Sequence, residues 1–120
     1  MLLADDSVLT CELFGEYLQA RGFTVDFAHD GEAAVAAALA AQPDVIIIDL
    51  SMPRLDGVGA IHRLKEDPRT RHIPVLVLTG HVASPRQQEA QRAGATAFLT
   101  KPCLPEAIEQ VIGDILARAA

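Results

Sequence analysis

Two short runs of apolar residues constrain the fold of this chain more than any other feature. Residues 45–48 read Val-Ile-Ile-Ile and residues 75–78 read Val-Leu-Val-Leu, with no polar residue among them. A strand that is apolar at every position has both faces covered, as in the interior of a parallel sheet with helices on each side. Each run ends at a polar residue, Asp49 in the first and Thr79 in the second. The pattern therefore predicts an α/β fold whose central strands carry polar groups at their carboxyl ends.

Helix signals separate the strands along the whole chain. Ser7 and Asp30 each precede a helical pattern as N-caps, and Ser84 with Pro85 and Gln87 forms a third start signal. The expected strands are residues 1–4, 24–28, 45–49, 75–79 and 98–100, and the expected helices are residues 8–21, 31–41, 58–66, 84–93 and 105–119. Five strand–helix units joined by right-handed crossovers give a five-stranded parallel sheet that is doubly wound, (βα)5.

The spacing of apolar residues predicts which face of each helix is buried. In the helix of residues 84–93 this face consists only of Ala90 and Ala93, so we expect this helix to be the most weakly docked. The other expected core-facing residues are Val8, Leu9, Leu13, Phe14, Tyr17 and Leu18 in the first helix, Val58, Ile61 and Leu64 in the third, and Leu104, Ile108, Val111, Ile112, Ile115 and Ala119 in the last.

The composition indicates one acidic domain. The 120 residues carry a net charge of −6, without a basic stripe or an apolar run of about 20 residues, so direct binding to nucleic acid or a membrane is not expected. The sequence shows no basic leader segment, which favours a cytoplasmic protein. We expect residues 1–120 to form a single domain, with no output domain in this chain.

The cysteines and histidines do not form a metal-ligand pattern. Cys11 and Cys103 lie far apart without CxxC spacing, and the four histidines are scattered. Both cysteines are therefore expected to be partly buried thiols in a reducing compartment, and zinc is not expected.

Charged and polar residues gather at the carboxyl ends of the predicted strands. Asp5 and Asp6 follow the first strand, Asp49 ends the third, and Lys101 follows the fifth. In a parallel sheet these ends share one edge, where such folds bind ligands. Neighbouring carboxylates repel one another, and a hard cation removes that conflict. Mg²⁺ prefers carboxylate and carbonyl oxygens, while a lysine ammonium and the Thr79 hydroxyl suit a phosphoryl group.

The order and spacing of these residues resemble the receiver (response-regulator) domain family of two-component signalling. Thr79 lies 30 residues after Asp49, and Lys101 lies 22 residues after Thr79. The resemblance covers essentially all 120 residues and is carried by Asp5-Asp6, Asp49, Met52-Pro53, Asp56-Gly57, Thr79-Gly80, Phe98 and Lys101-Pro102. It implies a flavodoxin-like, CheY-like topology with the strand order 2-1-3-4-5. The first expected strand is shorter than is common in the family, which implies a trimmed or atypical start.

The resemblance also implies a role for each site residue. Asp49 is implied to be the phosphoryl acceptor, and Lys101 is implied to pair with the phosphoryl group. Direct ligation of Mg²⁺ is implied for Asp6, Asp49 and the backbone carbonyl of Ser51, with Asp5 acting through water. Mn²⁺ could take the place of Mg²⁺ in such a site.

Further residues are implied to switch or modulate the domain. Thr79 would reach for the phosphoryl group, Phe98 would swing inward behind it, and the peptide bond before Pro102 is implied to be cis. Ser51 and His81 flank the site and could modulate the attack of water on the acyl phosphate. For His81 the favoured reading remains an exposed loop position without such a role.

On this interpretation the chain is a signalling domain that catalyses only its own phosphorylation and dephosphorylation. The donor would be a histidine of a sensor histidine kinase or of a phosphotransfer protein. Phosphorylation would shift a two-state equilibrium and alter a surface formed by the Ser84–Ala93 helix, the fifth strand and the last helix, where a downstream protein would bind. A second copy of the chain is a further candidate partner.

Three alternatives remain open from the residues. A haloacid-dehalogenase-like phosphatase also becomes phosphorylated on an aspartate that follows a strand. Such enzymes show a D-x-D pattern, and this chain has Ser51 in place of the second aspartate. A flavin-binding module of similar topology would offer hydroxyls and amides to a phosphate, which Asp5 and Asp6 would repel. A degenerate receiver would only bind partners, and the presence of Asp6, Asp49, Thr79 and Lys101 argues against it.

Overall fold

Five strands and five helices alternate along the residues that the computed structural model describes, 1–80 and 85–119. The strands are β1 (Leu2–Ala4), β2 (Asp26–Ala28), β3 (Ile46–Asp49), β4 (Val75–Thr79) and β5 (Ala97–Thr100). The helices are α1 (Val8–Ala20), α2 (Gly31–Ala41), α3 (Gly57–Glu66), α4 (Pro85–Ala93) and α5 (Pro105–Ala119). Every predicted element is present, and the largest shift is at β2, which begins two residues later than predicted. The predicted N-cap Ser84 lies outside the described residues.

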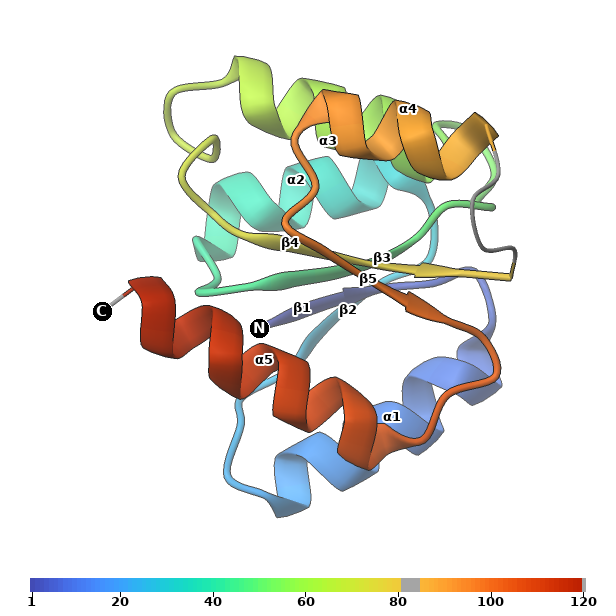
Figure 1. Cartoon of the computed structure of the whole chain (residues 1–120), viewed down its shortest axis with the longest axis vertical. Helices are drawn as coiled ribbons and strands as arrows, with labels where there is room; N and C mark the ends of the chain where they lie inside the picture. Colours follow the sequence, from blue (N-terminus) through green and yellow to red (C-terminus); the bar gives the residue numbers. More distant parts are fainter. Residues whose placement is uncertain (81–84, 120) are drawn as a thin grey trace.

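All five strands are parallel and lie in the order β2-β1-β3-β4-β5. Helices α2, α3 and α4 cover one face of the sheet, and α1 and α5 cover the other (Figure 1). The predicted doubly wound topology and strand order are therefore confirmed. This arrangement brings the carboxyl ends of β1, β3, β4 and β5 to one edge of the sheet.

The central strands are buried on both faces, as their sequence predicts. Ile46 and Ile48 of β3 pack in the cluster beneath α2, α3 and α4, whereas Ile47 packs in the opposite cluster with residues of α1 and α5. All three side chains are fully buried. Such strands have no polar face, so their functional groups can sit only where the strands end.

The predicted apolar face of α1 is partly wrong. Val8, Leu9 and Leu13 are 55%, 65% and 57% exposed, and the buried residues of α1 are Cys11, Gly15 and Leu18. These three positions recur at helical spacing and form the stripe that packs on the sheet, which turns the neighbouring leucines toward solvent.

The prediction for the last helix needs a similar correction. Leu104 precedes α5 and is 68% exposed, so it does not belong to the buried stripe. Ile108, Ile112 and Ile115 are buried as predicted, and in α3 the inward positions of Val58, Ile61 and Leu64 are confirmed.

Helix α4 has a small apolar contact with the sheet. Its buried residues are Ala90 and Ala93, as predicted, and alanine buries little area. That α4 is the most weakly docked helix stays a prediction. Among the described residues, none of the helices combines the length and the apolar character that crossing a membrane requires.

Candidate functional site

The acidic residues that follow β1 and end β3 meet at the carboxyl edge of the sheet. Ala4 of β1 lies opposite Ile48 of β3, so the next residues on the two neighbouring strands are Asp5 and Asp49. One carboxylate oxygen from each of Asp5, Asp6 and Asp49 lies within 4.8 Å of the others. The structure thus brings together the three carboxylates that the sequence singled out, and such a group could hold a metal ion.

Lys101 supplies a positive charge to this group. Its Nζ lies 2.9 Å from Asp5 Oδ2 and 3.3 Å from Asp49 Oδ2. The backbone N–H of Lys101 donates to the Thr79 carbonyl at 2.7 Å, which fixes the start of the side chain at the end of β4. The bond between Lys101 and Pro102 is cis, as the resemblance implied.

Backbone amides hold the second oxygen of each buried carboxylate. The Ser7 N–H donates to Asp5 Oδ1 at 2.9 Å, and the Ser51 N–H donates to Asp49 Oδ1 at 3.1 Å. Asp5 is 1% exposed and Asp49 8%, whereas Asp6 is exposed to solvent. Asp5 therefore acts as a buried anchor of the lysine, and Asp6 presents its carboxylate at the surface of the cluster.

Burial and charge act in opposite directions on the titration of this cluster. Burial raises the pKa of the Asp49 carboxyl, and the Ser51 amide and the Lys101 ammonium offset this only in part. Burial would lower the pKa of Lys101, but its hydrogen bond to Asp5 and the charge of Asp49 outweigh that effect and raise it. Lys101 therefore stays charged, and ionised Asp49 lacks full compensation.

This imbalance predicts that Asp49→Asn raises the melting temperature at neutral pH when Mg²⁺ is chelated. A carboxyl with a raised pKa in the folded state binds its proton more tightly there than in the unfolded chain, so its ionisation destabilises the fold. The wild type should become more stable as the pH falls from the raised pKa of folded Asp49 toward the ordinary aspartate pKa of the unfolded chain. The difference in melting temperature between Asp49→Asn and the wild type should therefore shrink over that interval.

The melting temperatures of the wild type and of Asp49→Asn, measured from neutral pH down to about 4, near the ordinary pKa of aspartate, test this prediction. Saturating Mg²⁺ should raise the melting temperature of the wild type more than that of Asp49→Asn, because an ion that binds the folded state stabilises it. A variant that melts at or below the wild-type temperature in chelator at neutral pH would contradict the prediction.

The structure describes three of the four remaining predicted residues. Thr79 ends β4 with 5% exposure, and Ser51 is exposed in the loop after β3. Phe98 of β5 is half-buried and packs against the cluster beneath α2, α3 and α4. His81 lies outside the described residues.

Gly57 supports the cluster in a way that the sequence did not reveal. A Cβ atom at this position would lie 2.5 Å from the Asp49 carbonyl oxygen and 2.6 Å from Leu50 Cα. The Gly57 N–H also donates to the Leu50 carbonyl at 3.0 Å. Asp56-Gly57 indicated only a turn and a family motif, but the glycine is needed because the start of α3 packs directly on the acceptor segment.

Cys11 and His29 lie beneath Asp5, and sequence reasoning missed both. His29 Nδ1 and Cys11 Sγ lie 3.1 and 3.5 Å from the Asp5 carbonyl oxygen, and 3.8 Å from each other. Burial, followed by the charge of Asp5, raises the pKa of Cys11 to about 11, so its thiol stays protonated. Separation by 18 residues in the chain left no local signal for this contact.

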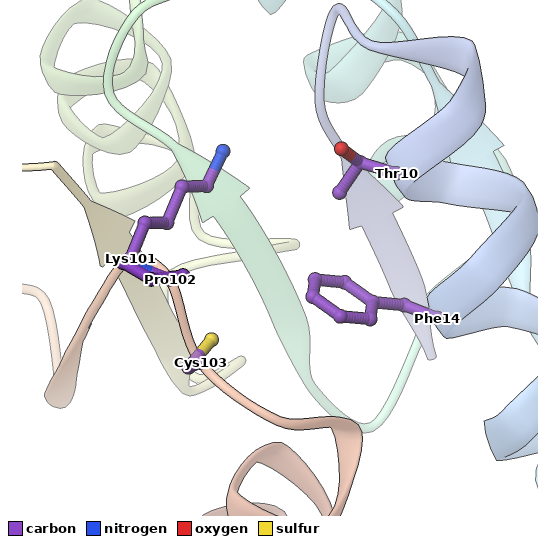
Figure 2. Close-up of a pocket in the computed structure, with 5 residues that line it drawn as sticks. All are labelled: Thr10, Phe14, Lys101, Pro102 and Cys103. Atoms are coloured by element: carbon purple, nitrogen blue, oxygen red, sulfur yellow. The ribbon is translucent and has the colours of Figure 1, made fainter.

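A cavity of about 340 Å³ adjoins the lysine on its α1 side. Lys101, Pro102 and Cys103 line one wall, and Thr10 and Phe14 of α1 lie across from them (Figure 2). The site is thus flanked by a mainly apolar hollow between α1 and the segment before α5.

The fold and the cluster define a doubly wound α/β domain with an acidic site suited to a cation beside a lysine. The sequence profile of the response regulator receiver domain matches residues 1–113, and the chain belongs to this family. It is therefore a signalling domain of the two-component type. This membership does not favour the phosphatase alternative.

Three known proteins illustrate the relationship. The chain is 38% identical to the response regulator PleD of Caulobacter vibrioides over 102 residues, 85% of this chain but 22% of the length of PleD. It is 28% identical to the polar-differentiation response regulator DivK of Brucella anthropi over 118 residues, 95% of this chain and 96% of DivK. The structure of the chemotaxis protein CheY4 of Vibrio cholerae superposes with a TM-score of 0.89 at 32% identity, covering 95% of both chains.

Proposed function

We propose that Asp49 accepts a phosphoryl group from a phosphohistidine of a sensor histidine kinase or of a phosphotransfer protein. The observation that carries this proposal is the Asp49 carboxylate beside the Lys101 ammonium, at 3.3 Å, within the acidic cluster. An oxygen of Asp49 forms the new O–P bond while the N–P bond of the donor breaks. The histidine nitrogen leaves with the bonding electron pair and takes a proton from solvent.

Mg²⁺ is the proposed cofactor, and Mn²⁺ could replace it. Asp6, Asp49 and the carbonyl of Ser51 would hold the ion, with Asp5 acting through water. The donor set supports this choice, because carboxylate and carbonyl oxygens are ligands of hard cations, and Lys101 pairs with only two of the three clustered carboxylates, Asp5 and Asp49. The ion would supply positive charge against the phosphoryl oxygens.

Lys101 and Thr79 would stabilise the transferred group. Charge in the transition state spreads over the equatorial oxygens, so a positioned ammonium contributes electrostatic stabilisation. Thr79 would donate a charge-assisted hydrogen bond worth roughly 1.5–3 kcal/mol, which shifts a two-state equilibrium about ten- to hundredfold. Phe98 would move with Thr79, and Ser51 and His81 would modulate the loss of the phosphoryl group.

The donor would dock beside the cavity that adjoins Lys101, on three exposed apolar side chains that we call the α1 patch, Leu9 and Leu13 of α1 and Leu104, which follows Cys103 of the cavity wall. These side chains are 65%, 57% and 68% exposed. Leu9 and Leu13 lie next to Thr10 and Phe14 around the helix, and thus next to the cavity beside Lys101. A helical partner that covers this patch would bring its phosphohistidine toward Asp49.

The output would use a different surface of the domain. We propose that α4, β5 and α5 form the surface that a downstream protein reads, because Phe98 packs beneath α4 and α4 has little apolar contact. A second copy of the chain could bind the same surface. We further propose that the domain acts in the cytoplasm and turns over no separate substrate.

The test is incubation with acetyl phosphate and Mg²⁺, followed by intact mass spectrometry. The wild type should gain one phosphoryl group that hydroxylamine removes, as expected of an acyl phosphate, and Asp49→Asn should gain none. Asp44→Asn is the matched control, because Asp44 flanks the same strand at its opposite end and is exposed. An unmodified wild type would overturn the proposal and favour a domain that only binds partners. A modified Asp49→Asn would overturn it by showing that another residue is the acceptor.

A further inference from the structure

Arg86 of α4 makes two hydrogen bonds to the loop that follows Asp49. Its Nη2 donates to the Leu50 carbonyl oxygen at 2.7 Å and to Asp56 Oδ2 at 3.1 Å. Leu50 directly follows Asp49, and Asp56 is the N-cap of α3. One guanidinium group therefore bridges both ends of the β3–α3 loop, and it ties that loop to a different helix.

A single peptide group connects Arg86 to the Asp49 carboxylate. The Leu50 carbonyl and the Ser51 N–H belong to the same planar peptide unit. At one end of this unit the Ser51 N–H donates to Asp49 Oδ1 at 3.1 Å, and at the other end the Leu50 carbonyl accepts from Arg86. A rotation of the unit that follows a change at Asp49 must therefore change the acceptor that Arg86 contacts.

The apolar contact of α4 is small, because its buried side chains are Ala90 and Ala93. Arg86 adds to it a polar link between α4 and the β3–α3 loop. The Gly59 N–H donates to the other oxygen of Asp56, Oδ1, at 2.8 Å, so the N-cap carboxylate of α3 is held on both sides. Both bonds of Arg86 leave from Nη2, whose two hydrogens point in directions fixed by the planar guanidinium, whereas the hydrogens of a lysine ammonium rotate freely.

We propose that Arg86 is a positioning residue that transmits the state of the Asp49 carboxylate to α4 through the Leu50–Ser51 peptide group. This inference rests on the proposed function, since it assumes that Asp49 is the group whose state changes. It adds a route along the β3–α3 loop to the one through Thr79 and Phe98. By reciprocity, the position of α4 also biases the orientation of the loop around Asp49.

The test is amide hydrogen exchange of α4 and of residues 50–57, with and without Mg²⁺ plus beryllofluoride as a phosphoryl mimic. The variants are Arg86→Ala and Arg86→Lys. Arg63→Ala is the matched control, because Arg63 forms a similarly exposed ion pair with Glu32, at 2.8 Å, that does not involve the β3–α3 loop. In the wild type and the control, the mimic should change exchange in both segments.

In Arg86→Ala, exchange of α4 without the mimic should rise about two- to tenfold, as expected for a lost hydrogen bond, and its response to the mimic should largely disappear. Arg86→Lys should recover part of that response. A response of α4 in Arg86→Ala equal to that of the control would overturn the inference, and so would no response in the wild type. Should the alanine variant unfold by circular dichroism, Arg86→Gln replaces it under the same criteria.

The proposed function fails separately from this inference. Acetyl phosphate labelling of Asp49, read by intact mass in the same preparations, depends on the acceptor site and needs no movement of α4. A labelled wild type with an equal α4 response in Arg86→Ala would reject the Arg86 route alone. An unlabelled wild type would reject the acceptor role of Asp49 and with it the premise of the route.

Discussion

Lys101→Met is expected to slow the phosphorylation of Asp49 by acetyl phosphate about 10²–10³-fold, the usual effect of removing one preorganised group that stabilises a transition state. Lys101 Nζ lies 3.3 Å from Asp49 Oδ2, so it is placed to neutralise charge on the transferred group. Time courses at saturating Mg²⁺, read by intact mass, measure the rate. Methionine keeps most of the side-chain volume while it removes the ammonium.

The same substitution should lower the free energy of unfolding by about 1–3 kcal/mol, because it leaves a buried polar group without its partner. Asp5 is that buried group, with 1% exposure and an Oδ2 that lies 2.9 Å from the Lys101 ammonium. Lys65→Met is the matched control. Lys65 is half-buried and donates to the carbonyls of Arg71 and Ile73, far in sequence from the cluster, so its loss should cost stability without slowing phosphorylation. A wild-type rate in Lys101→Met would contradict the role of the lysine.

Gly57→Ala is expected to lower the free energy of unfolding by about 1–3 kcal/mol, the usual cost of overpacking, and to slow phosphorylation about tenfold or more. The new Cβ would meet three backbone atoms, the Asp49 carbonyl oxygen, Leu50 Cα and the Asp49 carbonyl carbon, at 2.5, 2.6 and 3.1 Å. Backbone at the end of a buried strand cannot rotate away as a side chain can. The acceptor segment must therefore shift, and Asp49 shifts with it.

Gly113→Ala in α5 provides the control for this prediction. A Cβ at Gly113 has no heavy atom of a neighbouring segment within 4 Å, so alanine there should stabilise the helix by about 0.5–1 kcal/mol and leave phosphorylation unchanged. Denaturant titrations give both free energies, and intact mass gives both rates. If Gly57→Ala were as stable and as reactive as the control, the close approach of α3 to Asp49 would not matter.

Most of the fold and the placement of the charged cluster could be predicted from the sequence, because both depend on short sequence patterns. Residues 45–49 and 75–79 show within five positions that a strand is buried on both faces and where it ends. In a parallel sheet, the end of each strand then determines which edge its last residue occupies. Asp49 and Lys101 could therefore be placed near each other without knowledge of any contact between them.

What the sequence could not give depends on contacts between distant segments. Helix α1 has apolar residues on more than one stripe, and periodicity alone cannot tell that the stripe of Cys11 and Leu18 faces the sheet while Leu9 and Leu13 face solvent. The contact of Arg86 with Leu50 joins residues 36 apart and leaves no local pattern. The need for Gly57 likewise arises only once α3 packs on the end of β3.

The backbone bond between Lys101 and Thr79 separates the stiff parts of the site from the adjustable ones. Because the Lys101 N–H is tied to the Thr79 carbonyl at 2.7 Å, the two main chains cannot slide past each other without breaking it. A Thr79 hydroxyl that reached for a phosphoryl group on Asp49 would therefore turn about its own χ1 torsion, and Lys101 would flex its methylene stem. The ends of β4 and β5 thus behave as a fixed frame, on which the side-chain torsions of Thr79 and Lys101 are the adaptable elements.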